Sequence, residues 1–132
     1  TPCDILAPCA LGGCINSATI ERLKTKAICG SANNQLAEAS DAEKLHKKGI
    51  LYAPDFVVNA GGVINVTAEI EASGYDAIFS RDRLLEIRSR LGEIFVIAAR
   101  DNLTTNEAAE RLSNHRIEHG IGKRKTPPHF HH

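Results

Sequence analysis

The fold of this chain is decided by two stretches, GSANNQLAE at residues 30–38 and GILYAPDFVVNAGGVINV at residues 49–66. In each of them an apolar run is joined to a cluster of amides and glycines. Strands that are buried on both faces of a parallel sheet read as short continuous apolar runs, and ligands bind outside the carboxyl ends of such strands. The two stretches therefore predict parallel strands that end at a binding cleft.

Short apolar runs alternate with helical patterns through the first half of the chain. We expect strands at residues 4–7, 27–29 and 50–53, and a first helix that opens at Asn16 or Ser17. A helix between two consecutive strands of one sheet implies that the strands run parallel. The pattern predicts an α/β fold with a short parallel sheet of about three strands and flanking helices.

Two helices carry capping signals at their first residues. Ser40 with Glu43 predicts a capping box, and Gly49 predicts the end of the same helix. Thr104 with Glu107 predicts a second capping box, which opens the last helix.

Helices also dominate the second half of the chain. Asp55 is expected to cap a helix over residues 56–70 that bends or breaks at the glycine pair 61–62. Apolar residues recur at three and four positions over residues 81–100, which predicts a long amphipathic helix.

Composition excludes several classes of partner. The 132 residues suit one domain with a modest core. With 16 basic and 16 acidic residues, the chain has no global field for nucleic acid or an anionic membrane. No apolar run approaches the ~20 residues that span a bilayer, and the first residues lack the pattern of a secretory signal. We expect a soluble, cytoplasmic protein with no nucleic-acid or membrane partner.

The possible metal ligands show no metal-binding spacing. The four cysteines contain no C-x-x-C pair, so we expect small buried thiols. His115 and His119 are four apart and would share a helix face, but no carboxylate motif lies near them, so we do not expect them to bind a metal. The basic, His-rich end at residues 121–132 is expected to be a disordered tail after one domain at residues 1–120. We therefore predict no metal site.

Glycines and amides mark the candidate binding residues. The turn at residues 8–13 would let backbone approach a phosphate or a polar ring, although such turns also merely connect elements. Asn33 and Asn34 follow the second strand, and we expect one of them to serve the turn and the other a ligand. Asn59 and Asn65 flank the glycine pair, and Asn59 is the expected functional residue of the two.

The sequence offers a candidate apolar wall for a substrate but no candidate catalytic group. Val63 and Val66 lie three apart, as either ordinary core or an apolar wall for a substrate side chain. The lysines lie on helix faces or in the tail, so no general acid, base or nucleophile emerges. The chain also contains no G-x-G-x-x-G pyrophosphate cradle.

Three motifs resemble the carboxyl-terminal part of the glutamate, leucine, phenylalanine and valine dehydrogenase family, most closely its leucine dehydrogenases. They are CDILAPCALG at residues 3–12, ANNQLAE at residues 32–38 and the stretch at residues 49–66, and the resemblance covers residues 3 to about 118. It implies the second half of a Rossmann-type NAD-binding domain followed by C-terminal helices. The implied activity is NAD-dependent oxidative deamination of an L-amino acid to its 2-oxo acid and ammonia.

The resemblance also implies roles for individual residues. Cys9, Ala10 and Leu11 would lie along the nicotinamide-side ribose of NAD. Asn33 or Asn34 would reach the nicotinamide and the substrate, and we assign Asn33 to the cofactor and Asn34 to the substrate. Asn59 would hold the carboxamide of the cofactor, while Val63 and Val66 would line the substrate pocket. Such an apolar pocket suits an aliphatic or aromatic amino acid better than glutamate.

The family's remaining machinery has no match in these residues. Its glycine-rich nucleotide turn, its acidic residue for the adenosine ribose, its catalytic lysine and its catalytic aspartate belong to upstream segments, so we expect this chain to be inactive alone. If the strand order is 3-2-1-4-5-6, the strand at Asp4 leaves an open apolar edge. We therefore expect either a homo-oligomer or a missing N-terminal portion that completes the sheet.

The sequence is also compatible with two other functions. One is a free-standing half-domain that binds a nucleotide or a small amino acid without catalysis. The other is an interaction protein that uses the open strand edge to complement another polypeptide.

Overall fold

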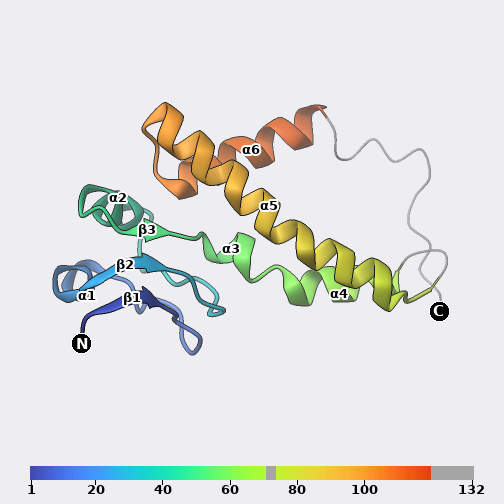
Figure 1. Ribbon diagram of the computed structural model, residues 1–132, viewed down its shortest axis with the longest axis horizontal. Helices are drawn as coiled ribbons and strands as arrows, with labels where there is room; N and C mark the ends of the chain where they lie inside the picture. Colours follow the sequence, from blue (N-terminus) through green and yellow to red (C-terminus); the bar gives the residue numbers. More distant parts are fainter. Residues whose placement is uncertain (71–73, 120–132) are drawn as a thin grey trace.

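The first half of the chain alternates strands with helices, and the second half consists of consecutive helices (Figure 1). The computed structural model describes residues 1–70 and 74–119. The predicted tail at residues 121–132 lies outside the described residues. Along the chain the elements are β1 (Cys3–Leu6), α1 (Ser17–Arg22), β2 (Thr25–Ile28), α2 (Ser40–Lys47), β3 (Leu51–Tyr52), α3 (Asp55–Val58), α4 (Gly61–Glu69), α5 (Ala77–Asp101) and α6 (Thr105–His119).

The three strands form one parallel sheet in the order β1-β2-β3, which confirms the predicted parallel arrangement. Its register sets two rows of side chains, because alternate residues of a strand face opposite sides. Leu6, Ile28 and Tyr52 are aligned in one row, and Ile5, Ala27 and Leu51 are aligned in the other.

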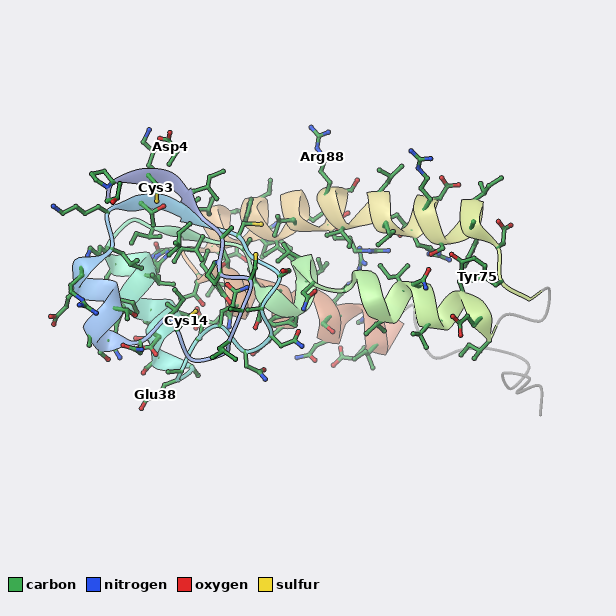
Figure 2. The ribbon with its side chains drawn as sticks, turned by 90° about the horizontal axis from the view of Figure 1, so that it is seen from below. Cys3, Asp4, Cys14, Glu38, Tyr75 and Arg88 are labelled. Atoms are coloured by element: carbon green, nitrogen blue, oxygen red, sulfur yellow. The ribbon has the colours of Figure 1, made fainter. Side chains whose placement is uncertain are left out.

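Only the first of these rows is covered. Ile28 and Tyr52 are buried in a core with Ile15, Ile20, Leu45 and Ile50, against which Leu6 packs. Figure 2 shows α1 and α2 together on one side of the strands. In the other row, Ile5 is 62% exposed and Leu51 is 45% exposed. The expectation of strands buried on both faces is therefore wrong for this chain, since both helices cover the same face.

Two of the predicted helix starts are confirmed. Asn16 caps α1, with its side chain accepting from the Thr19 N–H at 3.1 Å. Thr104 and Glu107 form the predicted capping box, because the Glu107 N–H donates to Thr104 Oγ1 at 3.2 Å and the Thr104 N–H donates to Glu107 Oε2 at 2.8 Å.

The capping box predicted at Ser40 is absent from α2. The Ser40 hydroxyl instead donates to the Glu38 carboxylate at 3.3 Å. The carboxylate of Asp41, which is 1% exposed, accepts from the Glu38 N–H at 3.1 Å and from Lys44 Nζ at 2.7 Å. Asp41 thus occupies the place that the spacing assigned to Glu43. The predicted end at Gly49 is confirmed by its φ of 72°.

The interruption predicted at the glycine pair is also observed, since α3 ends at Val58 and α4 begins at Gly61. The long helix α5 starts earlier than predicted, at Ala77, because the Asp76 carboxylate accepts from the N–H groups of its first turn. It packs against α4 and α6, and a second core forms there from Ile94, Ala98, Ala108 and Ala109.

The cysteines depart from expectation. All four are free, and Cys3, Cys9 and Cys29 are exposed rather than buried. Among residues 1–70 and 74–119, no group of three metal-ligating side chains converges. Over the same residues no helix has both the length and the apolar character needed to cross a membrane.

Gly30 is where β2 meets the loop that follows β1. A Cβ at this position would collide with the Pro8 carbonyl oxygen, which itself accepts from the Ala32 N–H at 2.9 Å. We expect Gly30→Ala to lower the free energy of unfolding by about 1–3 kcal/mol, as overpacking does. Gly92→Ala is the matched control, since open space surrounds Gly92 in α5 and alanine favours a helix by about 1 kcal/mol. Urea unfolding followed by circular dichroism measures both, and equal effects of the two variants would contradict the prediction.

Candidate functional site

Three loops meet where the strands end. The Gly13 N–H donates to the Asn34 carbonyl at 2.8 Å, which joins the loop after β1 to the loop after β2. The Gln35 N–H donates to Asp55 Oδ2 at 2.9 Å, which joins the loop after β2 to the first residue of α3. Because the strands are parallel, their carboxyl ends lie at one edge of the sheet. The structure thus brings the predicted turn, the asparagine pair and the segment that leads to Asn59 together.

The first two loops approach each other at Gly12 and Asn34. A Cβ at Gly12 would lie 2.8 Å from the Asn33 carbonyl oxygen, so only glycine allows this approach. Asn34 has a φ of 51°, the left-handed conformation that asparagine tolerates. Asn34 therefore has the turn role that was expected of one of the two asparagines, and its side chain is exposed.

Asn33 and Asn59 form a direct side-chain pair. Asn59 Nδ2 donates to Asn33 Oδ1 at 2.5 Å. An amide side chain has two N–H donors and an acceptor oxygen. Asn33 Nδ2 and Asn59 Oδ1 thus remain as a neighbouring donor and acceptor, which is the complement of a primary carboxamide.

Gln35 and Asp55 join the loops of this site through contacts that the sequence did not reveal. Gln35 is fully buried, and its Nε2 donates to the carbonyls of Gly30 at 2.7 Å and Ala32 at 3.0 Å. The prediction that Asp55 caps the next helix is wrong, since Pro54 precedes α3 and Asp55 is its first residue; the Asp55 carboxylate reaches Gln35 instead. Burial, with the negative charge of Asp55 nearby, raises the pKa of the Tyr52 phenol well above its usual range. Tyr52 is therefore a neutral hydroxyl at this site.

The remaining predicted residues lie on exposed surface. Leu11 is 79% exposed, and Cys9 and Ala10 of the same turn are exposed too. Val63 and Val66 on α4 are 68% and 59% exposed. The interpretation of these valines as ordinary core is wrong, because Ala68 is the buried residue of α4.

A separate cavity of about 530 Å³ lies among α3, α4, α5 and α6. Phe56, Ile64 and Ile94 are among its apolar lining residues. Arg83 and Arg90 also line it and both contact Glu86, at 3.4 Å and 2.8 Å. None of the eight predicted site residues lines this cavity. The candidate site is therefore the exposed loop surface, and the cavity is a distinct feature.

Two further groups, the Cys9 thiol of the turn after β1 and the Lys44 amine of α2, have pKa values that their neighbours shift. Hydrogen bonds from the side chain and backbone of Ser31 lower the pKa of the Cys9 thiol. A hydrogen bond to Asp41 raises the pKa of Lys44. A raised pKa keeps Lys44 protonated, which is the opposite of what an amine base requires.

The contact with Ser31 predicts the alkylation behaviour of Cys9. Its thiolate should form at a lower pH than in Ser31→Ala, because that variant loses the side-chain hydrogen bond that lowers the pKa. We expect iodoacetamide to modify Cys9 more slowly in Ser31→Ala at neutral pH, with the pH profile moved upward, as followed by peptide mass spectrometry. Cys3 is the internal control and should react at the same rate in both proteins. An unchanged Cys9 profile would show that Ser31 does not act on the thiol.

The chain is similar to known amino-acid dehydrogenases. The leucine dehydrogenase of Geobacillus stearothermophilus is 50% identical over 116 residues, which are 88% of this chain and 31% of that protein. The phenylalanine dehydrogenase of Lysinibacillus sphaericus is 50% identical over 115 residues, which are 87% of this chain and 30% of that protein. The crystal structure of L-tryptophan dehydrogenase from Nostoc punctiforme matches with a TM-score of 0.85 and 49% identity, covering 89% of this chain and 36% of that one.

These matches span nearly all of the described residues. The chain itself spans about a third of the length of the relatives it matches. A family model described as Glutamate/Leucine/Phenylalanine/Valine dehydrogenase matches residues 1–119, from β1 to the end of α6. The chain therefore belongs to the glutamate, leucine, phenylalanine and valine dehydrogenase family of oxidoreductases.

Proposed function

We propose that residues 1–120 form the second half of a Rossmann-type NAD-binding domain in an amino-acid dehydrogenase. The dehydrogenase would oxidatively deaminate an apolar L-amino acid to its 2-oxo acid and ammonia. The observation that carries this proposal is the Asn33–Asn59 pair at the point where three parallel strands end. The identity of the chain to leucine and phenylalanine dehydrogenases supports it.

The asparagine pair suits the nicotinamide end of NAD. Its free donor, Asn33 Nδ2, matches the carboxamide oxygen of nicotinamide, and its free acceptor, Asn59 Oδ1, matches the carboxamide N–H. Cys9, Ala10 and Leu11 offer an exposed turn beside Ser31 for the adjoining ribose. Bound there, NAD supplies the acceptor for the hydride that leaves the amino acid.

The substrate is proposed to be apolar and leucine-like. Val63 and Val66 place two apolar side chains on one exposed face of α4. Burying a side-chain carboxylate, such as that of glutamate, against this face would be unfavourable without a cation. The named specificities of three relatives, for leucine, phenylalanine and tryptophan, accord with an apolar pocket. Asn34 is the proposed polar contact of the substrate, since its turn role uses the backbone and its side chain is exposed.

We propose that catalysis needs groups outside this chain. Neither Lys44 nor Cys9 is placed as a base for deprotonating a substrate amine, and the family's catalytic lysine and aspartate have no counterpart here. The chain alone is therefore proposed to be inactive and to act in the cytoplasm, with no nucleic-acid or membrane partner.

A chimeric enzyme tests the proposed activity. Residues 1–119 of this chain replace the matching segment of the Geobacillus stearothermophilus leucine dehydrogenase, and NADH formation with leucine is followed by absorbance. We expect an active chimera, in which Asn59→Ala lowers kcat/KM by about tenfold or more, the cost of one unmade polar contact. Asn114→Ala on the exposed side of α6 is the control. A folded chimera that oxidises no amino acid would contradict the proposal, as would leucine oxidation by the 132-residue chain alone.

The exposed row on the sheet leads to a proposal for self-association. β1 pairs only with β2 among the described residues, and Ile5 of β1 is 62% exposed. Edge strands with apolar side chains pair with other chains, and a lysine on the strand opposes such pairing. The chain alone should therefore run as a dimer or larger species in size-exclusion chromatography with light scattering, and Ile5→Lys should shift it toward monomer.

Ile117→Lys is the matched control for this shift, since Ile117 on α6 is also 62% exposed. A stable monomer over a wide range of concentration would contradict self-association. Co-purification of a partner polypeptide that Ile5→Lys releases would favour an interaction protein that completes its sheet with another chain.

A further inference from the structure

Asp55 forms hydrogen bonds with both segments that carry the asparagine pair, the loop after β2 with Asn33 and the end of α3 with Asn59. We propose that Asp55 is a positioning residue, whose carboxylate and carbonyl together set the Asn33–Asn59 pair in place. The ligand of that pair rests on the proposed function, whereas the role of Asp55 in holding the pair rests on the geometry alone.

The side of the pair that carries Asn59 is held by the Asp55 backbone. The Asn59 N–H donates to the Asp55 carbonyl at 2.8 Å. Helix α3 is a single short turn from Asp55 to Val58, and Asn59 is the residue that ends it. The position of Asn59 therefore follows the position of Asp55.

The Asp55 carboxylate holds the side of the pair that carries Asn33. Its Oδ2 accepts from the Gln35 N–H at 2.9 Å, across 20 residues of sequence. Gln35 is itself fixed, because its carbonyl accepts from the Ile15 N–H at 2.9 Å and its side chain is fully buried. Asn33 lies two residues before this fixed point. A hydrogen bond to a charged acceptor is stronger than one between neutral groups, so the carboxylate is suited to this contact.

An ordinary helix cap binds only N–H groups of its own helix and does not join two segments, as Asp76 shows. The Asp76 carboxylate accepts from the N–H groups of Ile78 and Phe79, both in its own helix α5. The Asp55 carboxylate accepts one N–H from its own helix, that of Phe56 at 2.9 Å, and one from another loop. The two aspartates thus form a natural pair of test and control.

Hydrogen–deuterium exchange of the full chain, read by peptide mass spectrometry, tests the proposal without NAD. In Asp55→Ala, the Gln35 N–H loses its acceptor, so exchange in residues 33–36 and 57–60 should quicken together, by about 10- to 100-fold. Exchange over residues 42–47 of α2 should stay unchanged. Asp55→Asn keeps one oxygen acceptor and should restore part of the protection in both segments.

The Asp76→Ala control and the pattern of exchange in the Asp55 variants decide the proposal. Asp76→Ala should quicken exchange only at residues 77–80. Unchanged exchange at residues 33–36 in Asp55→Ala would overturn the proposal, and so would equal acceleration over the whole chain, which marks loss of the fold. If Asp55→Ala does not fold, Asp55→Asn decides: faster exchange in both segments supports the proposal, and wild-type exchange in both overturns it. If the paired acceleration occurs while the chimeric enzyme is inactive, Asp55 positions the pair and only the proposed function fails.

Discussion

The parallel pairing of β1, β2 and β3 is the constraint on which the rest of the structure depends. Parallel strands that are joined by helices end at the same edge of the sheet, so each loop that follows a strand is delivered to one place. The hydrogen bonds from Gly13 to Asn34 and from Gln35 to Asp55 then join these loops in sequence. If one strand were reversed, its loop would leave this edge and the polar side chains would separate.

The contacts between loops also explain which residue types stand there. Gly12 and Gly30 lie where one loop crosses the backbone of another, and a side chain at either position would meet a carbonyl oxygen. Asn34 has a left-handed backbone, and Gln35 is buried with both of its amide hydrogens used. Much of the ANNQ motif is therefore explained by loop packing, and Asn33 is the member whose side chain pairs with Asn59, the residue that follows α3.

The sequence predicted those parts of the molecule that depend on local signals. The strands, the cap at Asn16, the stop at Gly49, the break before Gly61 and the Thr104–Glu107 capping box all involve residues within a few positions of one another. The capping box at Ser40 failed because the backbone is already helical at Ala39, and Asp41 accepts from the Glu38 N–H, upstream of the predicted box. The link from Asp55 to Gln35 was missed because a hydrogen bond across 20 residues has no local pattern. The exposure of the cysteines and of Val63 could not be read from residue type, since it depends on which faces the helices cover.

The length of α5 has a mechanical consequence. A straight helix of 25 residues is a rod roughly 37 Å long, given its rise per residue. One end lies against α4, and near the other end Val57 of α3 packs on the core that α5 shares with α6. A small tilt of this rod at its far end would be transmitted as a lever to the turn that ends at Asn59. The Asn33–Asn59 pair is thereby linked to the distant end of α5 through packing contacts.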